Sequence, residues 1–207
     1  MDHDLEYAEK ALKAAESAVR YSKHDDPDLP ARQSELPRLL RSQFKRRPKE
    51  HLLKNAKENA NVAYETENAG GQTPRLSNLV DVLFTEFNDT EKEKPLDTLG
   101  RAIGCAFDAN EKTLGNSRHK AARLGGLSSL YEAKFRYFGC RRSLEQTIEY
   151  GAEDVKIDKD NATGNSGDQI PQTPARLGSL SNLYEACLTI RRSKFILKTP
   201  LFLQIKH

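Results

Sequence analysis

The residues best suited to chemistry in this chain are five histidines, three cysteines and a large set of carboxylates. The histidines are scattered, and none forms an HExxH pattern or lies near a cysteine at metal-ligand spacing. The sequence also contains no GxxxxGK(S/T), GxGxxG or GxSxG motif, so it offers neither a phosphate-binding loop nor a nucleophilic serine. We therefore predict that the protein is not an enzyme, with no catalytic residue, no metal ligand and no cofactor.

The remaining chemical candidates are weaker still. Cys105, Cys140 and Cys187 are odd in number, widely spaced and without a CxxC pair, which favours reduced thiols in the cytoplasm over a disulfide or a metal site. The carboxylates between Asp158 and Asp168 resemble a calcium-binding loop only distantly, because glycine at the sixth position and glutamate at the twelfth are missing.

Composition narrows the class of protein. Hydrophobic residues make up 37% of the chain and charged residues 30%, a balance that suits an elongated helical array with a thin core. The net charge of +3 points to neither nucleic acid nor a membrane surface. No apolar run approaches the ~20 residues of a membrane-spanning helix, and the acidic start lacks the features of a signal peptide. We expect no membrane partner.

A repeat becomes visible when four arginines are set in register. Arg32, Arg75, Arg123 and Arg176 are separated by 43, 48 and 53 residues. Apolar residues follow each arginine at offsets 4, 7, 8 and 12, which form one stripe of a helix with 3.6 residues per turn. These residues are Leu36, Leu39, Leu40 and Phe44; Leu79, Val82, Leu83 and Phe87; Leu127, Leu130, Tyr131 and Phe135; and Leu180, Leu183, Tyr184 and Leu188. The stripe predicts the first helix, helix A, of each repeat.

A second helix, helix B, is predicted after each of the first three A helices. Its apolar residues recur every four positions: Leu52, Ala56 and Ala60; Leu99, Ile103 and Phe107; Leu144, Ile148 and Ala152. An amphipathic helix with Ala8, Leu12, Ala15 and Val19 precedes the first repeat as an orphan B helix. We thus predict a single domain with an orphan helix at 4–23, repeats at 30–68, 73–113 and 119–157, a partial repeat at 173–194 and an apolar tail at 195–207.

Prolines and glycines add local expectations. Pro37 should kink its helix or delay its start, because proline donates no backbone hydrogen bond. Gly125, Gly126 and Gly178 should allow close approach to the preceding B helix, and Gly100 and Gly104 should be packing positions. The segment 158–172 has the composition of a loop.

This two-helix pattern resembles the tetratricopeptide family. The likeness covers residues 5–192 and is closest to variants of about 40 residues in large fungal proteins, which often accompany CHAT domains; the run Arg176–Tyr184 is typical of their A helices. The resemblance implies an all-α, right-handed superhelical array of antiparallel helix-turn-helix repeats. It also implies a non-catalytic protein-binding scaffold, commonly part of a longer chain.

By analogy with that family, the free faces of successive A helices line a groove for a peptide or helix of another protein. Offsets 6 and 9 supply its candidate residues: Arg38, Arg41, Asp81, Phe84, Ser129, Glu132, Asn182 and Glu185. Phe84 would be an apolar anchor for the partner. The alternative is an ordinary solvated face on which Phe84 packs against a neighbouring helix, and for Phe84 alone we favour that alternative.

A second candidate surface lies near the turns from A to B. Its basic residues are Lys45, Arg46, Arg47, Arg141, Arg142, Arg191 and Arg192. We favour their interaction with the negative ends of helix dipoles, and the alternative is an edge that binds nucleic acid or another phosphate-rich partner. A third possibility is a regulatory fragment of a larger effector protein. Without polar end caps, the array should belong to a longer chain, associate end to end, or be capped by its own tail.

Overall fold

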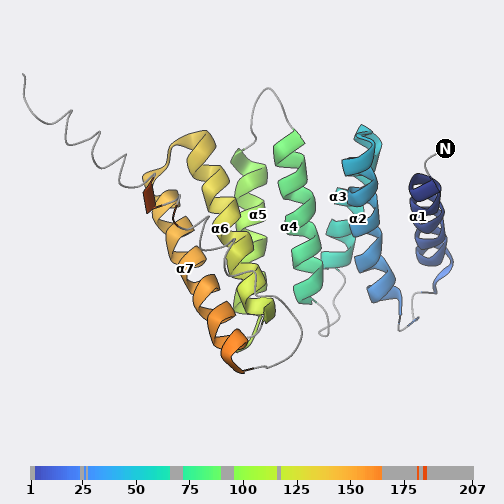
Figure 1. The fold of residues 1–207 in the computed structure, drawn as a ribbon. Helices are drawn as coiled ribbons and strands as arrows, with labels where there is room; N and C mark the ends of the chain where they lie inside the picture. Colours follow the sequence, from blue (N-terminus) through green and yellow to red (C-terminus); the bar gives the residue numbers. More distant parts are fainter. Residues whose placement is uncertain are drawn as a thin grey trace, which may run out of the picture. The chain divides into compact units, whose positions relative to one another are not determined.

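The part of the chain that the computed structural model describes comprises residues 3–23, 26, 28–65, 72–89, 96–115, 118–164, 181 and 184–185. Its helices are α1 (His3–Tyr21), α2 (Leu29–Arg46), α3 (Glu50–Glu65), α4 (Gln72–Asp89), α5 (Leu96–Glu111), α6 (Arg118–Phe138) and α7 (Arg141–Gly164) (Figure 1). These ranges contain no strand, which confirms the all-α class for this part of the chain. Most of the predicted partial repeat and the whole apolar tail lie outside the described residues.

The chain divides into two compact units, 1–114 and 115–207. In the first unit, α2 packs on α3 and α4 packs on α5, so each predicted repeat is a pair of neighbouring helices. Helix α4 also packs on α3 and directly on α2, while α1 packs on α2. In the second unit, α6 packs along α7.

The predicted stripe of the A helices is confirmed in α2, α4 and α6. Its buried members are Leu36, Leu40, Phe44, Leu79, Val82, Leu83, Phe87, Leu127 and Leu130. Leu39, Tyr131 and Phe135 are half-buried, and Tyr131 stacks on Tyr150 of α7 with ring centroids 5.6 Å apart. Of the fourth copy, the structure describes the environment of Tyr184 alone, which is 48% exposed and departs from the expected inward position.

The B helices bury most of the predicted stripe together with further alanines. In α5 the buried stripe is Leu99, Ala102, Ile103, Ala106 and Ala109. Phe107 is 44% exposed, so its predicted place in the core is wrong. The physical reason is that α5 packs on α4 through its alanines, such as Ala106. Phe107 follows Ala106 by one residue and therefore points about 100° away from this contact. Gly100 and Gly104 share this exposed side, and no atom lies within 4 Å of a Cβ built on either, so they are not packing positions.

Two expected boundaries are corrected by the structure. Helix α2 begins at Leu29 and continues through Pro37, so the expected late start is wrong. A proline removes a single intrahelical hydrogen bond, and the ring of Pro37 is buried beside the core residue Leu36. Helix α7 extends to Gly164, so residues 158–164 are helical rather than a loop. The longer α7 lies along the long helix α6. The side chain of Ile157 is buried there against Ala121 and Leu124 of α6.

Gly125 does allow a close approach, but the helix that approaches follows it in the chain. A Cβ built on Gly125 would lie 3.0 Å from Oδ2 of Asp154, a residue of α7 that is 3% exposed. The sequence predicted close approach to the preceding B helix, whereas the atoms nearest to this Cβ belong to α7. Gly126, the next residue, has no atom within 4 Å of such a Cβ.

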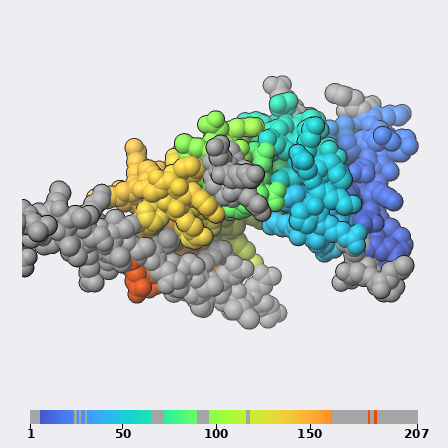
Figure 2. All heavy atoms as spheres, turned by 90° about the horizontal axis from the view of Figure 1, so that it is seen from above, coloured from blue at the N-terminus to red at the C-terminus, as the bar shows by residue number. Residues whose placement is uncertain are grey.

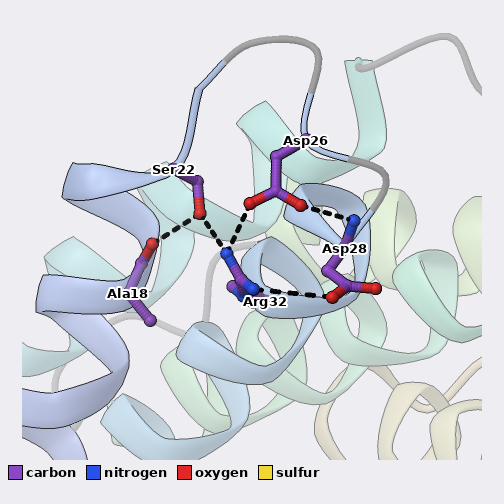
Figure 3. A network of polar contacts seen from close by, with 5 residues as sticks. All are labelled: Ala18, Ser22, Asp26, Asp28 and Arg32. Atoms are coloured by element: carbon purple, nitrogen blue, oxygen red, sulfur yellow. Dashed lines mark hydrogen bonds and ion pairs between the residues drawn. The ribbon is translucent and has the colours of Figure 1, made fainter.

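Arg32, the first arginine of the repeat register, joins α1 to α2 (Figure 3). Its Nη1 donates to Oγ of Ser22 at 2.6 Å and to Oδ2 of Asp26 at 2.7 Å. Ser22 in turn donates to the carbonyl of Ala18 at 2.6 Å, and the N–H of Asp28 donates to Oδ1 of Asp26 at 2.9 Å. The last turn of α1, the connection and the first turn of α2 thus share one polar network.

The two neighbouring glycines of α6 give a matched prediction. Replacing glycine by alanine in an open helix position stabilises a protein by about 0.5–1 kcal/mol, and we expect this for Gly126→Ala. Gly125→Ala should instead be less stable than Gly126→Ala by about 1–3 kcal/mol, because the new methyl presses on the buried Asp154. Urea unfolding followed by circular dichroism measures both, and equal stabilities of the two variants would contradict the close approach.

The network around Arg32 predicts that ionisation of Asp26 stabilises the docking of α1. The N–H of Asp28, and then the charge and hydrogen bond of Arg32, lower the pKa of Asp26 below its ordinary 3.8. A lowered pKa stabilises the folded state above the unfolded pKa, and that stabilisation is lost as pH falls through the folded value. Asp26→Asn should therefore reduce amide-exchange protection of α1 at neutral pH and leave α4 and α5 unchanged. Unaltered protection of α1 would contradict a role for the network in docking this helix.

Candidate protein-interaction surface

Four predicted partner-binding residues of the first unit and one residue of the predicted basic edge, Lys45, lie on the outer sides of α2 and α4, which we call the α2–α4 face: Arg38, Arg41, Lys45, Asp81 and Phe84. Nη2 of Arg41 lies 2.7 Å from Oδ2 of Asp81, so the two A helices are bridged by an ion pair. Nearer the start of both helices, Nδ2 of Asn78 donates to the carbonyl of Ser34 at 2.5 Å and to its Oγ at 3.0 Å. The contact between successive A helices is therefore polar on its outer side.

Two opposing effects act on the pKa of Asp81. Burial is the larger and raises the pKa of the carboxyl, while the charges of Arg41 and then Lys45 lower it. Lys45 is thus close enough to act on this carboxylate, which joins the end of α2 to the same cluster. An ionised carboxylate that loses water on folding costs stability, and perturbed ionisable groups of this kind are enriched where proteins bind other molecules.

Phe84 has both a packed and an open side. Its ring stacks on that of Phe87 with centroids 6.3 Å apart and an interplanar angle of 13°. Phe87 is fully buried, whereas Phe84 is half-buried. The ring therefore supports the core with one face and leaves apolar surface beside Asp81 one helical turn earlier.

The other predicted residues are distributed over both units. Arg38 is exposed on α2 and forms a salt bridge with Glu35 of the same helix. Ser129 and Glu132 lie on α6, where Oγ of Ser129 donates to the carbonyl of Gly125 at 3.0 Å and Glu132 accepts from Arg136 at 2.5 Å. Glu185 is exposed, and Asn182 lies outside the described residues.

The basic edge separates into two different environments. Lys45 and Arg46 occupy the last turn of α2, where the helix dipole favours positive charge, and Arg47 lies 3.7 Å from Glu9 of α1. Arg141 and Arg142 instead begin α7, where the dipole disfavours them, so dipole stabilisation fails as their explanation. Arg141 is offset by Glu145 at 3.0 Å. Arg191 and Arg192 are outside the described residues.

The turn before Arg141 contains features that no sequence pattern predicted. Gly139 has a φ of 65°, and Cys140 is exposed between it and α7. Hydrogen bonds from Ser143 lower the pKa of the Cys140 thiol, whereas burial raises that of Cys105. The cross-helix salt bridge of Lys57 and Glu86, at 2.7 Å, was also missed. Such pairs depend on how two helices are set against each other, which no local motif encodes.

Comparison with known proteins leaves the family open. No family model matches the sequence, and no curated protein matches it significantly. Within the described ranges, no three side chains of the metal-binding types gather in a cluster that could hold an ion. No described helix combines the length and the apolar character needed to cross a bilayer.

The ion pair between α2 and α4 predicts a pH-dependent effect of Arg41. Because the pKa of Asp81 is raised in the folded state, its ionisation costs stability as pH rises through that value, and Arg41 reduces this cost. Arg41→Met should lower the melting temperature more at about pH 7 than at about pH 3, where Asp81 is protonated. In the double variant with Asp81→Asn this pH dependence should vanish. A pH-independent effect of Arg41→Met would show that the guanidinium acts by packing alone.

Proposed function

We propose that this protein is a non-catalytic interaction scaffold that binds a peptide or helix of another protein along the A helices of its repeats. The observation that carries the proposal is the α2–α4 face, where two consecutive A helices present charged groups and one half-open aromatic ring on a common surface. A rigid helical support with a few exposed anchors suits protein recognition, because little order has to be gained on binding.

Packing in the first unit supports an array that curves with its A helices on the inner side. Helices α2 and α4 pack directly on each other, whereas the described residues of α3 and α5 make no comparable contact. An array whose A helices are closer together than its B helices bends toward the A side. This asymmetry is the support for a tetratricopeptide-like superhelix and for the placement of the binding surface.

The chemistry of the α2–α4 face favours an acidic segment with an apolar residue. Arg38 is offset by Glu35 and Arg41 by Asp81, so the exposed Lys45 supplies the net positive charge on the α2 side. Phe84 supplies apolar surface next to these charges. A partner with one large apolar side chain and neighbouring carboxylates would match both features.

A second candidate function is binding of a phosphate-rich partner, including nucleic acid, by the second unit. The observation that favours it is Arg142 at the positive end of α7, next to Arg141, whose charge Glu145 offsets. A second positive charge at this end is unfavourable unless an anion offsets it. Tyr137 and Phe138 are exposed beside the same turn. Arg191 and Arg192 of the predicted basic edge lie outside the described residues.

We also propose that the protein works in a reducing compartment such as the cytoplasm, as a segment of a longer effector chain. Cys105 on α5 and Cys140 in the turn before α7 are free thiols, and neither forms a disulfide. An exposed thiol such as Cys140 persists in reduced form most readily in the cytosol.

Peptide selection from a displayed random library, followed by affinity measurements on purified full-length chain, tests the scaffold function. Phe84→Ala should weaken the selected peptide at least ~10-fold, because buried aromatic anchors dominate such interfaces. The matched control is Phe107→Ala, which removes an equally large exposed ring on α5, outside the α2–α4 face, and should change affinity less than ~2-fold. The variant Phe84→Leu keeps most of the side-chain volume that packs on Phe87 but removes the aromatic ring. A loss of affinity in this variant therefore reports on binding rather than on the stability of the fold.

The outcomes distinguish the two candidates. Equal affinities of the parent, Phe84→Ala and Phe84→Leu would rule out the α2–α4 face as the binding surface. Binding that falls steeply with salt, and is lost in Arg142→Glu but kept in Phe84→Ala, would favour the phosphate-rich partner.

A further inference from the structure

Helix α1 carries a second apolar stripe beside the one that packs on α2. The first stripe, Ala8, Leu12, Ala15 and Val19, is half-buried. The second consists of Tyr7, Ala11, Ala14, Ala18 and Tyr21, with alternating spacings of four and three residues. Each of its first four members precedes a member of the first stripe by one position, so the two stripes lie about 100° apart. Such a breadth of apolar surface is typical of a helix with neighbours on two sides.

The second stripe is open. Tyr7 is 68% exposed and Tyr21 is 79% exposed, Ala11 and Ala14 are exposed, and Ala18 is half-buried. Within the described chain α1 packs on α2, at the end of the first unit that Figure 2 shows in dark blue. Nζ of Lys10 lies 5.8 Å from the centroid of the Tyr7 ring, on the flank of the stripe away from α2.

We propose that a second copy of this chain docks on this stripe, with the two α1 helices antiparallel about a two-fold axis at Ala14. The stripe is nearly symmetric about that residue, because Tyr7 and Tyr21 are each seven residues away. In an antiparallel pair, Tyr7 of each copy lies opposite Tyr21 of the other, Ala11 lies within one residue rise, about 1.5 Å, of the level of Ala18, and Ala14 meets its own copy. A two-fold dimer requires a surface that is complementary to itself, and this stripe has that property.

The side chains in the stripe suit close contact of two helices. Three alanines allow the backbones to approach closely, and the spacing of four and three residues is that of a coiled-coil seam. The tyrosines at the two ends supply most of the apolar area and keep their hydroxyls at the edge of the contact.

Charge along α1 favours the antiparallel direction. Glu6 and Glu9 lie in the first half of the helix, where they pair with Lys10 at 2.7 Å and with Arg47 at 3.7 Å, and Arg20 lies in its last turn. Antiparallel docking places the acidic half of each helix beside the basic end of the other, with Glu6 within about one turn of the partner's Arg20. A parallel pair would instead place like charges side by side, which is unfavourable.

The contact is small and the dimer is correspondingly weak. From Tyr7 to Tyr21 the stripe is about 21 Å long, and one helix pair of this length covers less than the ~800 Å² per partner of a standard interface. Association should therefore depend on protein concentration and approach completion only at the upper end of the accessible range.

Sedimentation velocity of the full chain over a wide concentration range tests the dimer. Ala14→Arg places two like charges at the two-fold axis and should weaken dimerisation at least ~10-fold. Since Ala14 is exposed and arginine is a good helix former, the fold should be retained, which circular dichroism verifies. The matched control is Ala122→Arg, the same change at an exposed alanine of α6, and it should leave dimerisation unchanged.

Cysteine cross-linking tests the direction and the register. Ala14→Cys should form an intermolecular disulfide above the level of the parent chain, which already contains Cys105, Cys140 and Cys187. Ala11→Cys should not, because two copies of position 11 are displaced by about 9 Å along the helices, beyond the ~7 Å between Cα atoms that a disulfide spans.

Three outcomes would overturn the proposal. A chain that stays monomeric at every concentration would show that the stripe is solvated or is reserved for another helix. Dimers that persist in Ala14→Arg would place the interface elsewhere. Equal cross-linking of Ala11→Cys and Ala14→Cys would exclude the antiparallel register.

Discussion

Close packing of each A helix through one leucine- and aromatic-rich stripe is the constraint on which the described structure depends. The stripe buries Leu40 in α2, Leu83 in α4 and Leu127 in α6, and each of these side chains is almost completely removed from water. A helix that directs offsets 4, 7, 8 and 12 inward must turn offsets 6 and 9 outward, because at 100° per residue both lie on the side of the helix away from the centre of that stripe. The face proposed to bind a partner is therefore a geometric consequence of the core.

The B helices meet that constraint with small side chains. Alanines at positions 56, 60 and 63 of α3 and at 102, 106 and 109 of α5 are buried, so the helices approach closely without large residues on both sides. Such packing leaves larger apolar groups at the margins, as Phe107 shows. It also accounts for the low apolar content of the chain, because alanine contributes little hydrophobic area while filling the contact.

The second unit is held together differently from the first. Ser143, Thr147 and Asp154 of α7 are buried polar residues, and Oγ of Ser128 donates to the carbonyl of Thr147 at 2.9 Å. Buried polar groups need partners in a fixed geometry, which restricts the register of α6 against α7 more tightly than apolar contacts do. Gly125 belongs to this arrangement, since its missing side chain leaves room for Asp154.

By itself the sequence determined the helical class, the A-helix stripes and the pairing of helices, because apolar periodicity is a local property that reports which face is buried. It also placed Arg41 and Asp81 on the outward face. Only the tertiary structure decided that these two meet, that Gly125 faces α7, and that Phe107 stays outside. Each of these depends on the distance and rotation between helices far apart in the chain, and those are set by the combined packing of both partners rather than by any local pattern.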